Sequence, residues 1–182
     1  MTLAEKKRKQ SIAEYVLFMW QMEDLVRAVH FDAGELDGFI RSYIPGPEAF
    51  EEERQWFHKI MQQMRTEKLE KKGHLSDVHE LMFELNFLHG TLLSIIKDKT
   101  YLDLHRQAQP YLAEYAERAG KSPNSDVEAA LVALYGLLLL RLKKEPVSTA
   151  TEEAMKTFSS MLARLSYQYQ KMKDNERNVA MN

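Results

Sequence analysis

Residues 11–30 constrain the fold most, because they have the length of a helix and are apolar on nearly every side (SIAEYVLFMWQMEDLVRAVH). At 3.6 residues per turn, Val16 and Met19 share an arc with Glu23. Glu14 is one of only two residues on a side that could face water. A helix that is apolar all round belongs inside a bundle, so the sequence predicts a central helix that carries charged residues into the core.

The charges in this helix need partners, because an unpaired charge inside a bundle is strongly unfavourable. Glu23 and Arg27 stand at i, i+4 in the favourable order, and Asp24 lies beside them. If they are a sealed structural pair, Glu23→Ala and Arg27→Ala should each be strongly destabilising, and a double change to apolar residues should be tolerated. The alternative is a ligand site that these residues share with His89 and Arg141.

Length and composition exclude several classes of protein. A chain of 182 residues fits one domain with a single core. Its net charge of −2 gives no field that attracts nucleic acid or an anionic membrane. Without cysteine it has neither disulfides nor a thiolate metal site. The apolar run 129–140 is shorter than the roughly 20 residues of a membrane-spanning helix. We expect a cytoplasmic protein without a signal peptide.

Glycine and proline divide the chain into helical segments with heptad-like apolar stripes. We predict an all-α, single-domain bundle of about seven helices over residues 1–182. The first helix (11–30) and the sixth (126–142) are expected to be the most buried. A basic arm (1–10) and a polar, frayed tail (174–182) complete the prediction. The predicted breaks lie at residues 45–47, 73, 120–123 and 146, and a kink is expected at Pro110.

Helix starts are predicted from capping patterns. Ser125 with Glu128 should open the sixth helix, and Thr100 and Thr149 are candidate caps for the helices before and after it.

Four stretches resemble one known family when they are taken together. They are SIAEYVLFMWQMEDLVRA near the start, KKGHL at 71–75, LNFLHGTLL at 85–93 and ALYGLLLLRL at 133–142. As a set they are similar to the domain-of-unknown-function family numbered 4924, over about residues 8–169. The resemblance implies a compact all-α fold and a bacterial cytosolic setting. It implies no activity, so the function has to be argued from the residues.

Metal-binding and catalytic motifs are missing from the sequence. Di-iron bundles use paired Glu-x-x-His motifs and many zinc proteases use His-Glu-x-x-His, and neither pattern occurs here. No two of the six histidines stand at i, i+4. A Gly-x-Ser-x-Gly elbow and a glycine-rich phosphate loop are also absent. We therefore predict no metal site, no cofactor and no catalytic residue, which favours a non-enzymatic protein.

Two single residues still suggest a site. His89 continues an apolar stripe, so its ring should face the core, where it either bonds a carboxylate or carbonyl or contacts a ligand. Arg141 follows four leucines at the end of the sixth helix. It can bond the last carbonyls, pair with Glu23 or Asp24, or bind an anion.

Two functional hypotheses follow. The preferred one is a non-enzymatic interaction or scaffold protein with a buried structural polar network and an as yet unidentified protein partner. Trp56, at the rim of a methionine-rich helix, predicts a weak to moderate homodimer. The alternative is a small-ligand-binding protein or enzyme that uses the cluster of Glu23, Asp24, Arg27, His89 and Arg141. A sealed network favours the scaffold, and a cavity with unpaired donors favours the ligand.

Overall fold

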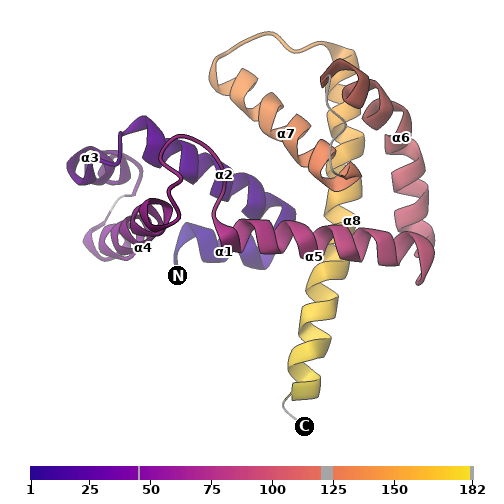
Figure 1. The fold of residues 1–182 in the computed structure, drawn as a ribbon, viewed down its shortest axis with the longest axis horizontal. Coiled ribbons are helices and arrows are strands. Elements are labelled where there is room, and N and C mark those ends of the chain that lie inside the picture. The colour runs from indigo at the N-terminus through magenta and orange to yellow at the C-terminus, as the bar shows by residue number, and fades with distance from the viewer. Residues whose placement is uncertain (45, 120–124, 181–182) are drawn as a thin grey trace. The chain divides into compact units, whose positions relative to one another are not determined.

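The computed structural model is all-helical and describes residues 1–44, 46–119 and 125–180 (Figure 1). Its helices are α1 (Leu3–Gln10), α2 (Ile12–Ala28), α3 (Ala33–Tyr43), α4 (Pro47–Thr66), α5 (Ser76–Ser94), α6 (Lys99–Ala119), α7 (Asp126–Leu142) and α8 (Thr149–Ala180). Among the described residues there is no strand, so the predicted all-α class is confirmed. The breaks predicted at Pro45 and at residues 120–123 lie outside the described residues.

The helix count in the described chain is eight rather than about seven, because the segment expected as a basic arm forms α1. Thr2 opens α1 with a capping box, in which its hydroxyl accepts a hydrogen bond from the Glu5 amide and the Glu5 carboxylate accepts one from the Thr2 amide. This reciprocal cap satisfies two amides that would otherwise lack partners, and it starts a helix that then packs against α2.

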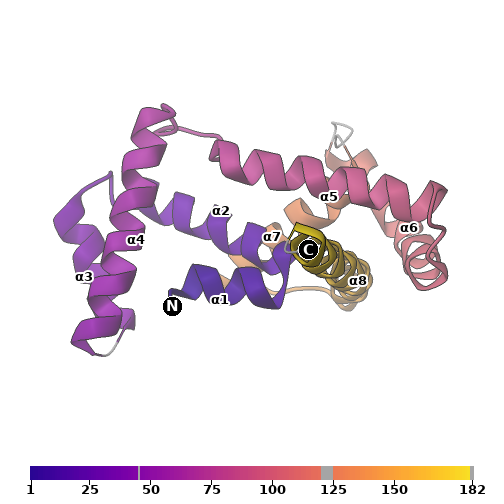
Figure 2. The same ribbon diagram turned by 90° about the horizontal axis from the view of Figure 1, so that it is seen from below.

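The chain folds into two compact units, Met1–Leu81 and Met82–Asn182, and α5 begins in the first and continues into the second. In the first unit α1 packs on α2, α2 on α4, and α3 on α4 (Figure 2). Val16, Leu36 and Met64 are among its fully buried side chains. Burial of these apolar groups is what holds the four helices together.

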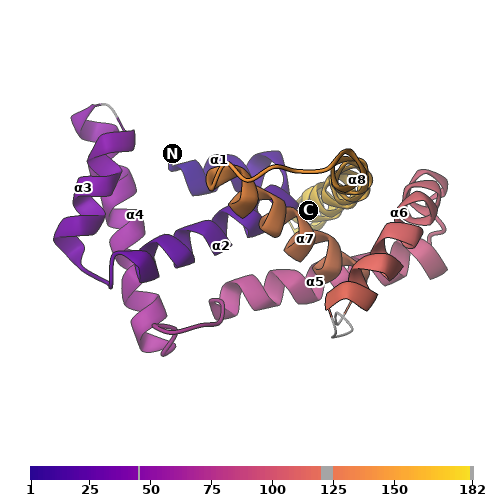
Figure 3. The same cartoon turned by 90° about the horizontal axis from the view of Figure 1, so that it is seen from above.

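In the second unit the long helix α8 packs against both α6 and α7 (Figures 1 and 3). Its buried stripe includes Phe158, Leu162 and Leu165, which have the helical spacing expected from the sequence. Although α6 contains Pro110, it is assigned as one helix from Lys99 to Ala119. Helix α8 runs to Ala180, through most of the segment expected as a frayed tail.

The helix starts in the second unit were predicted in part. Ser125 caps α7 by accepting a hydrogen bond from the Glu128 amide at 3.0 Å, as expected. Helix α6 is capped by Asp98 rather than Thr100, since the Asp98 carboxylate accepts from the Tyr101 amide at 2.7 Å. Among the described residues, no helix is long and apolar enough to cross a membrane.

Candidate functional site

Glu23 is the most deeply buried of the predicted site residues, with none of its surface exposed. One carboxylate oxygen accepts a hydrogen bond from the Leu75 amide at 2.9 Å, and the other lies 2.5 Å from Nδ1 of His74. The His74 ring also stacks on Trp20, with centroids 4.9 Å apart. Glu23 therefore fixes the start of α5 to the C-terminal half of α2.

Arg27 binds a neighbouring part of the same connection. Its guanidinium donates to the carbonyls of Leu69, at 3.0 Å, and of Gly73, and it pairs with Asp24 at 2.8 Å. Gly73 has a φ of +95°, a left-handed conformation that favours glycine. Glu23 and Arg27 thus bind different groups and do not pair with each other. Glu23 accepts a hydrogen bond from a backbone amide of the segment 69–75, and Arg27 donates to backbone carbonyls of the same segment.

The five residues expected to form one cluster occupy separate environments. Glu23, Asp24 and Arg27 lie together on α2 in the first unit. His89 is on α5 in the second unit, next to Tyr101 and His105. Arg141 is exposed at the end of α7, where its nearest carboxylate is Glu152 at 3.9 Å. The Glu23 carboxylate is itself fully buried and both of its oxygens have partners, which favours a structural role for it, while His74 and Asp24 beside it are partly exposed.

His89 belongs to a group of polar side chains that the sequence does not predict. Its Nδ1 lies 2.7 Å from the Tyr101 hydroxyl, and its ring meets that of His105 at a centroid distance of 5.1 Å. His105 Nε2 in turn lies 2.7 Å from Oδ2 of Asp126. One ring nitrogen from each histidine and one oxygen of Asp126 all lie within 4.8 Å of one another. We call His89, His105 and Asp126 the triad.

Electrostatics in the triad follow from burial and contact. Burial, followed by the proximity of His105, lowers the pKa of His89. The hydrogen bond from His105 is the largest of several contacts that lower the pKa of Asp126. Burial also raises the pKa of Tyr101, so this hydroxyl is held neutral beside His89. The group therefore presents one carboxylate to two imidazoles.

Sequence patterns pointed to only one member of this group, His89. His105, Asp126, Tyr101 and Gln109 were missed, because the ligand-type residues come from three helices and within-helix spacing rules cannot relate them. The only local signal is that His105 and Gln109 stand at i, i+4 on α6, which places their side chains on one face.

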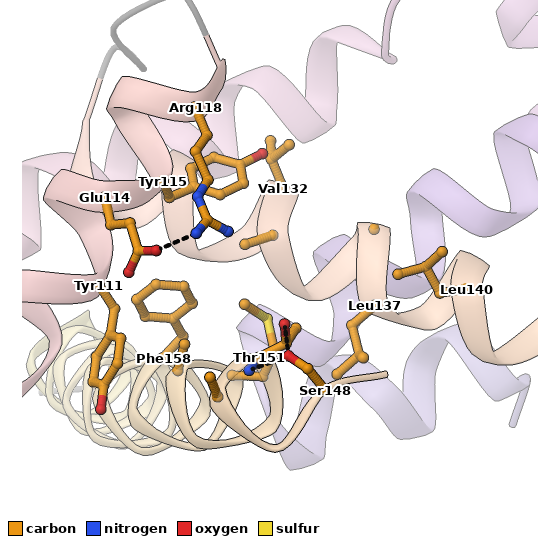
Figure 4. A pocket seen from close by; sticks show the side chains of 15 residues that line it. Tyr111, Glu114, Tyr115, Arg118, Val132, Leu137, Leu140, Ser148, Thr151 and Phe158 are labelled. Carbon is orange, nitrogen blue, oxygen red and sulfur yellow. Dashed lines mark hydrogen bonds and ion pairs between the residues drawn. The ribbon is translucent and has the colours of Figure 1, made fainter. Parts of the chain in front are cut away.

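A second feature of the same unit is a pocket of about 520 Å³ between α6, α7 and α8 (Figure 4). Tyr115 on α6, Val132 and Leu137 on α7, and Met155 and Phe158 on α8 contribute to its walls. Figure 4 shows these elements surrounding one common space. Its walls are thus mostly apolar, and none of the five predicted site residues contributes to them.

Polar groups lie at two places on this pocket. Glu114 and Arg118 form an ion pair at 2.5 Å on α6. At the start of α8 the hydroxyls of Ser148 and Thr151 lie 2.9 Å apart. Gly136 also lines the pocket, and apart from its own helix no atom of the described chain lies within 4 Å of where its Cβ would stand. The space in front of this glycine is therefore open.

Comparison with known proteins gives a family and nothing more specific. The family model described as Domain of unknown function (DUF4924) matches residues 1–176, which confirms the resemblance seen in the sequence. No curated protein matches the chain, and no solved structure matches it.

Proposed function

The chain belongs to the family Domain of unknown function (DUF4924), and from its own residues we propose that it is a non-enzymatic protein that binds a small, mainly apolar molecule. The proposed site is the pocket between α6, α7 and α8. A volume of about 520 Å³ lies within the range of roughly 300–1,000 Å³ that is usual for small-molecule sites. Apolar walls with a few polar groups are also typical of such sites.

The observation that carries the proposal is the open space in front of Gly136. Glycine in a helix interior costs about 1 kcal/mol relative to alanine. At this position alanine would meet no neighbouring atom of the described chain, so packing within the protein does not require the glycine. A bound molecule that lies against α7 would explain why a side chain is missing there, in a helix otherwise dominated by leucine, valine and alanine.

The polar groups suggest an amphipathic ligand. Arg118 and Glu114 are both well exposed, and exposed ion pairs contribute at most about 1 kcal/mol. An anionic group on the ligand can therefore replace Glu114 as the partner of Arg118 at little cost. The apolar part of the molecule would lie between Phe158 and Leu137.

The test uses 1-anilinonaphthalene-8-sulfonate, whose aromatic body and single sulfonate match this pocket. We expect saturable binding of one probe molecule with micromolar affinity, measured by fluorescence titration. Gly136→Leu should fill the pocket and abolish this binding. Gly136→Ala is the matched control, because it adds only a methyl group, and it should keep the binding and stabilise α7 by about 1 kcal/mol.

Two results would contradict the proposal. One is the absence of saturable binding to the parent protein. The other is equal binding to the parent and to Gly136→Leu, with both proteins equally helical by circular dichroism, because the probe would then lie outside the pocket.

The interaction or scaffold role is kept as the second candidate, and one observation favours it. Phe83 and Phe87 stand one turn apart on α5, and they are 74% and 68% exposed. Exposed aromatic side chains of this kind are common at contacts between proteins. Trp56, expected to anchor a homodimer, packs on Phe18 and Phe57 within its own unit, with centroids 5.8 and 4.9 Å away.

Light scattering tests this second candidate, with Phe83→Ser and Phe87→Ser as variants. A dimer that both variants weaken would support it, and a strict monomer at micromolar concentration would refute the homodimer. We also propose a cytoplasmic location, which the absence of cysteine supports. We further propose that the chain is a single domain in which α2 and α7 are the most buried helices. Fully buried side chains such as Val16 and Leu131 support this.

A further inference from the structure

We propose that His89, His105 and Asp126 form a binding site for a divalent transition-metal ion. The three side chains come from α5, α6 and the first turn of α7. One potential ligand atom from each lies within 4.8 Å of the other two. This site is separate from the apolar pocket, and no residue of the triad lines that pocket.

The donor set indicates the class of metal. Two imidazole nitrogens and one carboxylate oxygen suit zinc and ferrous iron, whereas magnesium and calcium prefer oxygen ligands alone. Three protein ligands on a tetrahedral ion leave a fourth position for water or another molecule. Two neutral imidazoles and one carboxylate also leave a net positive charge on a divalent ion, which favours an anionic or polar fourth ligand.

The distances between the potential ligand atoms of the triad are close to those that a bound metal ion requires. With metal–ligand bonds of about 2.0–2.1 Å, tetrahedral ligand atoms stand roughly 3.3 Å apart. In the structure His105 Nε2 and Asp126 Oδ2 are 2.7 Å apart, so they would separate slightly around an ion. A ring nitrogen of His89 lies within 4.8 Å of a potential ligand atom of each of the other two residues, so it would approach by about 1–2 Å. Side-chain rotation alone supplies movements of this size.

The hydrogen bonds at the triad are mutually incompatible, and this is a second, independent observation. Gln109 Nε2 lies 2.8 Å from His105 Nε2 and 2.8 Å from Asp126 Oδ2, while those two atoms are themselves 2.7 Å apart. If His105 Nε2 carries a proton, it donates to Asp126 and then faces the Gln109 amide donor to donor. If it carries none, it faces an ionised carboxylate acceptor to acceptor.

Exchanging the oxygen and nitrogen of the Gln109 amide does not remove the conflict, because the amide oxygen would then face the carboxylate of Asp126. A cation between His105 Nε2 and Asp126 Oδ2 removes it, since both atoms then bind the ion as acceptors. Gln109 would be left as a donor to the second lone pair of the carboxylate oxygen.

Outer contacts hold the ligands in place, as they do at metal sites generally. The Tyr101 hydroxyl, 2.7 Å from Nδ1 of His89, orients that ring. Ser125 donates to Oδ1 of Asn86 at 2.6 Å, which fixes the start of α7, and with it Asp126, to α5 near His89. The side chain of His105 is 16% exposed and that of Asp126 is 37% exposed, so an ion can reach the site from solvent.

The experiment is a calorimetric titration of the protein with zinc after treatment with EDTA. We expect one equivalent of zinc to bind with micromolar or tighter affinity and to raise the melting temperature, and magnesium at the same concentration to do neither. Failure of the parent protein to bind zinc would overturn the proposal, whatever the outcome of the probe titration of the pocket.

Substitutions of the proposed ligands test where the metal ion binds. Asp126→Asn and His105→Gln should each weaken zinc binding about tenfold or more, and both keep a polar side chain of similar size. His58→Gln is the matched control, because Nε2 of His58 also lies 2.6 Å from an aspartate, Asp37, in the first unit. It should bind zinc as the parent does. Equal affinities for the parent and both triad variants would place the ion elsewhere and overturn the assignment.

Discussion

Removal of the Glu23 carboxylate should destabilise the protein more than any change at a surface glutamate. The carboxylate has no exposed surface, and it accepts hydrogen bonds from the Leu75 amide and from His74. In Glu23→Ala the buried Leu75 amide loses its partner, which costs about 1–3 kcal/mol. His74 is 37% exposed and can rehydrate, so its lost bond adds about 1 kcal/mol.

The side-chain volume removed from the core adds roughly 1 kcal/mol more, since about one buried methylene is lost with the carboxylate. The sum is about 3–5 kcal/mol, the range found when one partner of a buried charged pair is deleted. For a chain of this length it corresponds to a fall in melting temperature of about 6–20 °C. Glu23→Gln keeps an acceptor for the Leu75 amide, so it should cost only about 1 kcal/mol.

Glu14→Ala is the control in this series, because Glu14 lies on the same helix, is 56% exposed and pairs with Lys7 at the surface. It should cost less than about 1 kcal/mol. Urea unfolding followed by circular dichroism measures all three variants. If Glu23→Ala lies within about 0.5 kcal/mol of the parent, the usual range for surface changes, the structural role argued for the buried Glu23 carboxylate is wrong.

Two further predictions concern the carboxylates of Asp98 and Glu53. The hydrogen bond with Arg164 is the main cause of the lowered pKa of Asp98. The contribution of Asp98 to stability is therefore present above the unfolded value of 3.8 and is lost as the pH falls through the folded pKa. In acid, Asp98→Asn should lose less melting temperature than the parent protein does. Burial raises the pKa of Glu53, whose Oε2 has no partner among the described residues. At neutral pH, Glu53→Gln should therefore melt at the same temperature as the parent or at a higher one. The difference in melting temperature between the two proteins should shrink as acid protonates Glu53.

The fold class could be predicted from the sequence because its signals are local. Apolar residues at helical spacing and scarce glycine and proline specify helices without reference to any distant residue. The cap at Ser125 was predicted for the same reason, since a cap involves atoms only three residues apart. Helix α1 was not predicted: Thr2 and Glu5 have the spacing of a capping box, but the run of basic residues after them is equally typical of a solvated arm.

The partners of buried charges could not be predicted in the same way. The i, i+4 rule suggested that Glu23 and Arg27 pair, but such pairs contribute only about 0.2–0.5 kcal/mol on a helix surface. Backbone groups of the segment 69–75 offer stronger, buried hydrogen bonds, and these decide the arrangement. An apolar double substitution would therefore leave the Leu75 amide unsatisfied, so the structure reverses the expectation that it is tolerated.

The triad shows the limit of motif-based reasoning most clearly. Known helical metal motifs place two ligands on one helix, where spacing alone brings them to one face. Here each helix contributes a single ligand, so every test of spacing is negative while the atoms lie within 4.8 Å. The one usable signal was a histidine on an apolar stripe, His89, because such a residue needs a polar partner from another helix. In this chain a lone polar residue on an apolar face, and no paired motif, indicated the cluster, and zinc titration of the triad variants tests whether that cluster binds a metal.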